Sequence, residues 1–140
     1  MFTWSNISKQ RMEGVNQRLI NVFNLGLSRS PVDFGIAYMG GLRTVEQQNE
    51  LFKAGVSKCD GYNIKSRHQF GEALDFIPYI GGQYLLPSVY HNKYYFIIFG
   101  VIYSASVELN IPVRFGANWN GDEIWIDDQD FDDYPHVELK

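Results

Sequence analysis

Cysteine and positive charge are both scarce in this sequence of 140 residues. Its single cysteine, Cys59, excludes an internal disulfide and a multi-cysteine metal cluster. Stability must therefore come from packing or from a metal held by other ligands. The net charge of -4 and the pI near 5.3 argue against a nucleic-acid partner, because proteins that bind nucleic acid normally present a basic face to phosphate.

A long apolar run is also missing, since a membrane span needs about 20 apolar residues. The most hydrophobic stretch, residues 94–103, is soon followed by Ser104, Ser106 and Glu108. We therefore expect a buried core helix there and no stable membrane insertion. The N-terminus lacks the basic start and apolar run of a secretory signal, so we expect the chain to be made in a cytoplasm. Its length predicts one domain over residues 1–140, which we expect to be monomeric.

Apolar periodicity predicts helices alternating with short strands. Helical spacing and capping signals mark residues 8–27, 44–55 and 91–109. Thr44 and Gln47 form the capping box that begins the second of these helices. Period-two alternation marks strands at 34–38, 73–77, 113–115 and 136–139, with Pro78 ending the second strand and an exposed loop over 56–67. This order favours an α+β domain in which helices pack on a small antiparallel sheet.

The segment SRHQFGEALDF, residues 66–76, combines a histidine with an acid placed among apolar residues. Asp75 lies between Leu74 and Phe76, and a buried carboxylate must be paired or bound to a metal to offset its desolvation. A catalytic zinc takes three protein ligands from His, Asp or Glu and leaves the fourth position for water. His68 and Asp75 supply two ligands, and His136 is the best remaining candidate. The predicted zinc site then lies on the sheet.

The residues alone leave another interpretation open. In it, His68 is an exposed loop residue, Asp75 pairs with Arg43 or Arg114, and His136 only ends a strand. The remaining histidine, His91, stands at the start of a predicted helix, and we expect it to be structural or exposed.

The segment SRHQFGEALD resembles a known signature, S-x-H-x-x-G-x-A-x-D. It is typical of the zinc peptidases that include D-alanyl-D-alanine carboxypeptidases and L-alanyl-D-glutamate endopeptidases. In that family the histidine and the aspartate of the signature bind zinc. A later histidine, with an acid three positions before it, completes the site, and here these residues are His136 and Asp133. GLRT at 41–44 and RFGANWNGD at 114–122 resemble further family segments, so the likeness spans residues 32–139.

The strongest resemblance is to small single-domain endolysins of tailed phages, which cut the L-alanyl-D-glutamate bond of peptidoglycan stem peptides. Asp133 stands where many relatives carry glutamate, and Val137 where many carry tryptophan; the aspartate favours the endolysin branch. The resemblance implies peptidoglycan as the substrate, lysis of the host, and a holin partner. It also implies residence in the host cytoplasm before release and in the periplasm or cell wall afterwards.

The resemblance also implies a division of roles. Zinc activates a water molecule, and Asp133 transfers its proton to the leaving amine. Arg43 binds a substrate carboxylate or the oxyanion, because a guanidinium donates paired hydrogen bonds and keeps its charge. Ser66 contacts the substrate or supports the site. Glu138 is a further candidate, since alternation places it on the same strand face as His136.

The stretch 122–133 holds seven acidic residues and no lysine or arginine. Asp128, Asp130 and Asp132 have the alternate spacing that begins a calcium-binding loop, but Asp133 stands where a glycine is expected. A regulatory Ca²⁺ and a solvated acidic loop are both compatible with this stretch.

Three rival functions are compatible with the sequence. The same fold serves D-alanyl-D-alanine carboxypeptidases. A noncatalytic, zinc-stabilised cell-wall-binding module would use the metal only for folding, although Asp133 and an open fourth ligand position argue against it. A lytic enzyme carried on the virion and used during infection would have the same chemistry.

Overall fold

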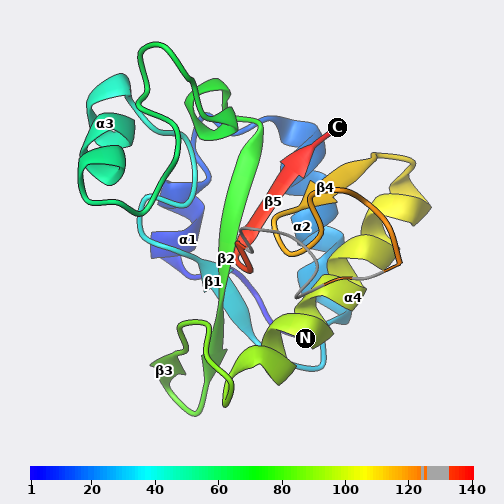
Figure 1. The fold of residues 1–140 in the computed structure, drawn as a ribbon. Helices are drawn as coiled ribbons and strands as arrows, with labels where there is room; N and C mark the ends of the chain where they lie inside the picture. Colours follow the sequence, from blue (N-terminus) through cyan, green and yellow to red (C-terminus); the bar gives the residue numbers. More distant parts are fainter. Residues whose placement is uncertain (124, 126–132) are drawn as a thin grey trace.

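Helices surround a small antiparallel sheet in the computed structural model, which describes residues 1–123, 125 and 133–140 (Figure 1). The helices are α1 (Asn6–Arg11), α2 (Gln17–Arg29), α3 (Val45–Lys53) and α4 (Asn92–Leu109), with the 3-10 helix η1 (Arg67–Phe70). The strands are β1 (Phe34–Ile36), β2 (Ala73–Ile80), β3 (Gln83–Tyr84), β4 (Val113–Phe115) and β5 (His136–Leu139). The expected α+β class is confirmed.

Strand β2 lies at the centre of the sheet, and its pairing with the neighbouring strands sets their alignment. The strand order is β1-β2-β5-β4, with β3 paired to β2, and the pairings are antiparallel. Leu74 stands opposite Val137, and Asp75 stands opposite His136. Because strand neighbours lie about 5 Å apart, this register alone brings two of the predicted ligands together.

The core lies between the sheet and helices α2 and α4. Helix α4 buries residues at spacings of three and four, including Tyr95, Ile98 and Ile102. Across from it, Gly26 of α2 faces Ile102 so closely that a Cβ at Gly26 would lie 3.4 Å from the Ile102 Cγ1 atom. In the part of the chain that the structure describes, no helix combines the length and the apolar character that a membrane crossing requires.

The prediction of a single helix over residues 8–27 is wrong, because the chain turns between α1 and α2. Gly14 has a φ of +79°, a left-handed conformation that favours glycine. Asn16 then caps α2, its side chain accepting a hydrogen bond from the Arg18 N–H. Gly14 and Asn16 both indicate a break between helices, but the apolar spacing continues across them and is typical of one continuous helix.

The expected end of the central strand at Pro78 is also wrong, because β2 continues to Ile80. Pro78 has no N–H group to donate, but the backbone groups next to it continue the hydrogen bonds between the strands. The Tyr79 N–H donates to the Asp33 carbonyl at 2.9 Å, and the Pro78 carbonyl accepts from the Leu85 N–H at 3.0 Å. The first strand is shorter than expected, ending at Ile36, and β3 was not predicted.

Replacing Ile102 with alanine tests the packing of α4. Ile102 is fully buried against α2, so Ile102→Ala should lower the free energy of unfolding by about 2–5 kcal/mol, the usual cost of such a truncation in a core. Urea denaturation followed by circular dichroism measures it. Val107→Ala is the matched control on the same helix, because Val107 is 62% exposed, and it should change stability by less than about 0.5 kcal/mol.

Candidate metal centre

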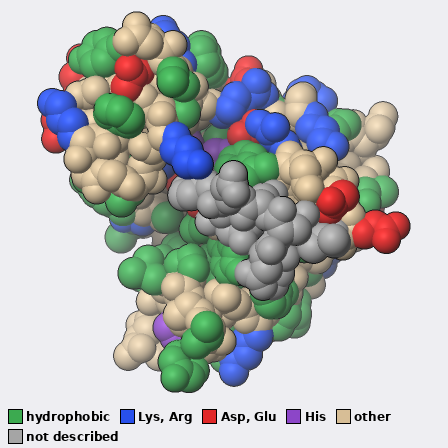
Figure 2. Space-filling model, viewed as in Figure 1, with side chains coloured by type: hydrophobic (Ala, Val, Ile, Leu, Met, Phe, Trp, Pro, Cys, Tyr) green, Lys and Arg blue, Asp and Glu red, His purple; other side chains and the backbone are tan. Residues whose placement is uncertain are grey.

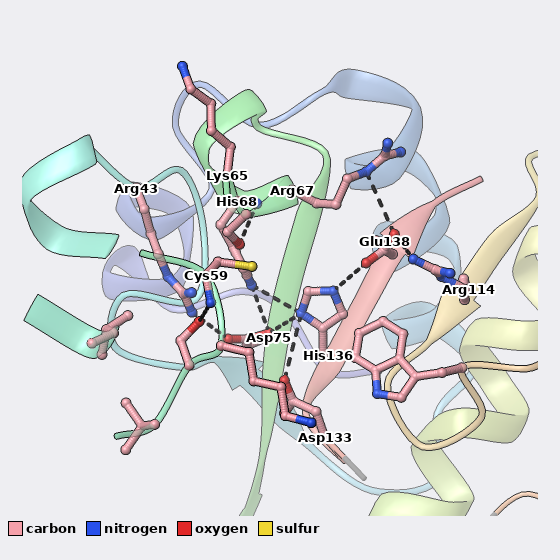
Figure 3. Close-up of a pocket in the computed structure, with 16 residues that line it drawn as sticks. Arg43, Cys59, Lys65, Arg67, His68, Asp75, Arg114, Asp133, His136 and Glu138 are labelled. Atoms are coloured by element: carbon pink, nitrogen blue, oxygen red, sulfur yellow. Dashed lines mark hydrogen bonds and ion pairs between the residues drawn. The ribbon is translucent and has the colours of Figure 1, made fainter. Parts of the chain in front are cut away.

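Three predicted ligands from separate elements converge at one point (Figure 3). His68 comes from η1, Asp75 from β2 and His136 from β5. The His68 Nε2 atom lies 3.1 Å from Asp75 Oδ1 and 3.2 Å from His136 Nδ1, and His136 Nδ1 lies 3.2 Å from Asp75 Oδ1. One ligand atom from each residue lies within 4.8 Å of the others. The structure therefore gathers the residues that the sequence predicted.

Hydrogen bonds on the outer side of each imidazole decide which nitrogen faces inward. The His68 Nδ1–H donates to the Gly41 carbonyl at 2.9 Å, and the His136 Nε2–H donates to Glu138 Oε1 at 2.9 Å. The lone pairs of His68 Nε2 and His136 Nδ1 are then directed at each other and at a carboxylate oxygen. Such a set of acceptors repels itself unless a cation lies among them, so these residues fit a divalent metal.

The pKa values of Asp75 and His136 are shifted by these same close contacts between the side chains. Burial of Asp75 opposes its negative charge, but interactions with His68 and His136 outweigh burial and hold the pKa of Asp75 well below its usual value. Burial opposes the charge of His136, but its hydrogen bonds with Asp75 and Glu138 raise its pKa to about 9. The surroundings thus favour positive charge between these residues, whether a proton or a metal supplies it.

Arg43 binds the other oxygen of Asp75. Its Nη2 atom lies 2.9 Å from Asp75 Oδ2, its Nε–H donates to the Met39 carbonyl at 2.7 Å, and its Nη1–H donates to Gln48 Oε1 at 3.1 Å. The pairing of Asp75 with Arg43, which the sequence offered as an alternative to metal binding, thus coexists with the histidine cluster. Arg114 does not pair with Asp75. Contact of Arg43 with substrate stays a prediction.

Asp133 lies beside the cluster. Its Oδ2 atom is 4.0 Å from His136 Nδ1, and its side chain is 34% exposed. Burial and the nearby charge of Asp75 raise the pKa of Asp133 to about 6, against the opposing effect of His136. A carboxyl group with a pKa in this range can both accept and return a proton near neutral pH.

Gly116, which belongs to the family-like segment 114–122 but has no sequence signal of its own for this role, holds Asp133 in this place. The Asp133 N–H donates to the Gly116 carbonyl at 3.0 Å, and the Gly116 N–H donates to the His136 carbonyl at 2.8 Å. A Cβ at Gly116 would overlap the Asp133 carbonyl oxygen and lie 3.0 Å from the His136 Cβ. A side chain at position 116 would therefore displace both functional residues.

Glu138 connects His136 to two arginines. The residue is buried, and while Oε1 accepts from His136, Oε2 lies 3.0 Å from Arg114 Nη2 and 3.6 Å from Arg67 Nε. Trp119 packs against both sides of this network, with its ring 5.1 Å from the His136 ring and 5.1 Å from the Arg114 guanidinium carbon. The expectation that positions 136 and 138 share a face is confirmed by their hydrogen bond.

The remaining candidates lie around this centre or away from it. The Ser66 hydroxyl accepts a hydrogen bond from the His68 N–H at 3.3 Å and caps η1. His68 therefore lies in a 3-10 helix, whereas the sequence predicted a loop. Ser66 also lines the cleft, and its contact with substrate stays a prediction. His91 does not line the cleft, and its Nδ1–H donates to the Leu86 carbonyl at 2.8 Å, which fits the expected structural role. The calcium hypothesis rests on Asp128, Asp130 and Asp132, which lie outside the described residues.

The cluster opens into a cleft of about 770 Å³. Figure 2 shows this face of the molecule, with blue lysine and arginine side chains gathered around a recess in which a histidine is visible. The cleft is lined by residues that include Arg43, Lys65, Ser66, Arg67, His68, Asp75, Arg114, Trp119, Asp133, His136 and Glu138. A bound metal would therefore be accessible to a ligand from solvent.

Comparisons with known proteins agree with this geometry. The L-alanyl-D-glutamate peptidase of Escherichia phage T5 is 32% identical over 140 residues, which cover 99% of this chain and 98% of the phage T5 protein. The crystal structure of the L-Ala D-Glu endopeptidase ChiX of Serratia marcescens superposes with a TM-score of 0.77 at 27% identity, covering 99% of this chain and 90% of ChiX. The profile of the phage L-alanyl-D-glutamate peptidases matches residues 1–140, and the chain therefore belongs to that family.

Proposed function

We propose that the protein is a metal-dependent endopeptidase that hydrolyses the L-alanyl-D-glutamate bond of peptidoglycan stem peptides and so lyses a bacterial host. The observation that carries this proposal is the convergence of His68, Asp75 and His136 at an open cleft with Asp133 beside them. Membership of the phage peptidase family supports the same bond and substrate. An L-alanyl-D-glutamate endopeptidase of similar fold supports it further.

Zinc is the metal we propose for this centre. Two imidazole nitrogens and one carboxylate oxygen form the ligand type of catalytic zinc sites, which leave a further position open. When bound, zinc would polarise the scissile carbonyl and activate water for attack. The Gly41 carbonyl and Glu138 would fix the two imidazoles in the tautomers that binding requires.

Asp133 is the residue we propose as general base and general acid. It lies next to the ligand cluster without belonging to it, and its raised pKa suits transfer of a proton in both directions. It would take the proton of the attacking water and return it to the leaving amine. Gly116 would keep the Asp133 backbone close enough to His136 for this transfer.

Arg43 and Ser66 complete the proposed site. Arg43 orients Asp75 through Oδ2, and the remaining hydrogens of its guanidinium would bind a substrate carboxylate or the oxyanion that develops in the transition state. Ser66 holds η1 through its cap, and its hydroxyl lines the cleft where it would contact the substrate. We assign both residues to substrate binding.

The biological setting follows from the proposed activity. We propose that residues 1–140 act as a single catalytic domain and as a monomer. The protein would stay in the host cytoplasm until a holin gives it access to the periplasm and the cell wall. A regulatory Ca²⁺ at 122–133 remains a separate hypothesis, and use during infection from the virion would require the same chemistry.

Mass analysis of digested peptidoglycan tests the bond. Purified protein incubated with isolated cell wall should release fragments that begin with D-glutamate, and new D-glutamate amino groups should appear with time. A D-alanyl-D-alanine carboxypeptidase would release free D-alanine in their place. A noncatalytic wall-binding module would release no fragment. Either of the last two results contradicts the proposed endopeptidase.

Removal of the metal should abolish activity and lower thermal stability. Dialysis against a chelator should reduce hydrolysis to background, and added Zn²⁺ should restore it. The melting temperature should fall as well, because a metal that binds only the folded state stabilises it by about 4 kcal/mol at 1,000 times its Kd.

His136→Ala should lose the metal in elemental analysis. His91→Ala is the matched control, since His91 does not line the cleft, and it should keep both metal and activity.

Asp133→Asn should leave the fold and the metal content intact and slow hydrolysis. The amide preserves the shape of the side chain but cannot take a proton, and loss of a general base costs about 10²–10⁴-fold in rate. Measuring kcat on a soluble stem peptide, with zinc quantified in the same sample, separates a catalytic defect from metal loss. A variant that keeps zinc and cuts at the wild-type rate would show that Asp133 does not transfer the proton.

A further inference from the structure

The cleft is basic although the chain is acidic. Among the described residues, five lysines or arginines and three acids line it: Arg43, Lys58, Lys65, Arg67, Arg114, Asp75, Asp133 and Glu138. The whole chain has 12 basic and 16 acidic residues, so the charge of the cleft is opposite to that of the chain, and blue side chains gather around the recess in Figure 2. A cleft of one sign attracts ligands of the other sign and raises their local concentration. The surface therefore suits an anionic substrate.

The proposed substrate carries such a charge next to the bond that is cut. Glutamate has two carboxyl groups, and only one of them can form the next peptide bond of the stem. The other stays a free carboxylate on the residue whose amine is released. If the proposed function holds, the cleft must receive this carboxylate close to the metal centre, where an unpaired charge would be costly.

Arg114 is the arginine best placed to receive it. Each of the three nitrogens of Arg43 already has a protein partner. Within the part of the chain that the structure describes, Arg114 has one hydrogen-bond acceptor, Glu138 Oε2, for its five N–H groups. Its side chain is 44% exposed, and the Trp119 ring supports the guanidinium at 5.1 Å. Arg114 is thus held in place, and most of its donors have no partner among the described residues.

Arg67 lies next to Arg114 but is more strongly engaged. Both approach the same Glu138 oxygen, at 3.0 Å for Arg114 Nη2 and 3.6 Å for Arg67 Nε. Arg67 also pairs with Glu72 at 2.9 Å and donates to the Leu139 carbonyl. Because the two guanidiniums meet at a single oxygen, one substrate carboxylate could reach both. In Figure 3 they lie on the Glu138 side of the cluster, away from Arg43.

We propose that Arg114, assisted by Arg67, binds the free carboxylate of the glutamyl residue and makes the enzyme specific for an acidic residue after the scissile bond. The site deepens the proposed function, on which it rests. Arg114 binds the carboxylate of the leaving-group residue, whereas Arg43 holds Asp75 and keeps the oxyanion as its contact with the substrate. Glu138 joins the two halves, since one of its oxygens orients His136 and the other positions Arg114.

Two synthetic stem peptides test the proposal. They are identical except that the free carboxylate of D-glutamate is a carboxamide in the second. The wild-type enzyme should prefer the carboxylate in kcat/KM by about tenfold or more, since a charge-assisted pair of hydrogen bonds is lost with the amide. Arg114→Gln should bring the ratio close to one, Arg114→Lys should keep part of it, and Arg67→Gln should lower it less. The ratio does not depend on how much of a variant is folded, because both peptides meet the same preparation.

Two control variants separate substrate binding from support of the site. Asp133→Asn should slow the hydrolysis of both peptides and leave their ratio unchanged, because both arginines and Glu138 remain. Arg29→Gln removes a comparable pair, Arg29 with Glu108 at 2.7 Å, outside the residues that line the cleft, and should change neither rate. Equal wild-type rates on the two peptides, or an unchanged ratio in Arg114→Gln, would overturn the proposal. Failure of the wild type to cut either peptide would instead contradict the proposed endopeptidase.

Discussion

The centre depends on electron pairs that are directed at one another. His68 Nε2, His136 Nδ1 and Asp75 Oδ1 lie 3.1–3.2 Å apart, an arrangement of acceptors that is unfavourable without a positive charge among them. The fold maintains it from outside, since the Gly41 carbonyl and Glu138 occupy the outer nitrogens of the two imidazoles. The structure therefore resists the tautomers and rotations that would relieve the repulsion. A cation relieves it without any such rearrangement.

The buried carboxylate of Asp75 binds two sets of partners at once, one through each of its oxygens. Oδ1 faces the histidines and Oδ2 faces Arg43, so a metal at the first oxygen leaves the second one paired. Arg43 is in turn held by Met39 and the buried Gln48, which ties the segment before α3 to the central strand. Because a buried carboxylate that loses its partner is strongly destabilising, the ion pair preserves the fold near the centre whether or not a metal is bound.

Patterns local in sequence predicted much of this structure, and contacts distant in sequence were harder to foresee. Asp75 could be identified because an acid inside an apolar strand needs a partner, and the capping box at Thr44 was found as expected. The division of the first helix was missed, because apolar spacing continues across Gly14 and Asn16. The pairing of Asp75 with His136 depends on a register between strands 61 residues apart, which periodicity alone does not fix. The support from Gly116 and the partners of Glu138 likewise depend on tertiary packing.

Glu138 explains how a metal centre and a basic wall can occupy one small cleft. If the arginines stood alone, their charge would oppose a divalent cation nearby; if the carboxylate stood alone, its burial would be costly. Placed between them, Glu138 has a lowered pKa, because its hydrogen bonds with His136 and Arg114 and their charges outweigh burial. It therefore stays ionised and separates the two positive regions. In the proposed mechanism, each would act on a different part of the same substrate, the carbonyl at the metal and the carboxylate at Arg114.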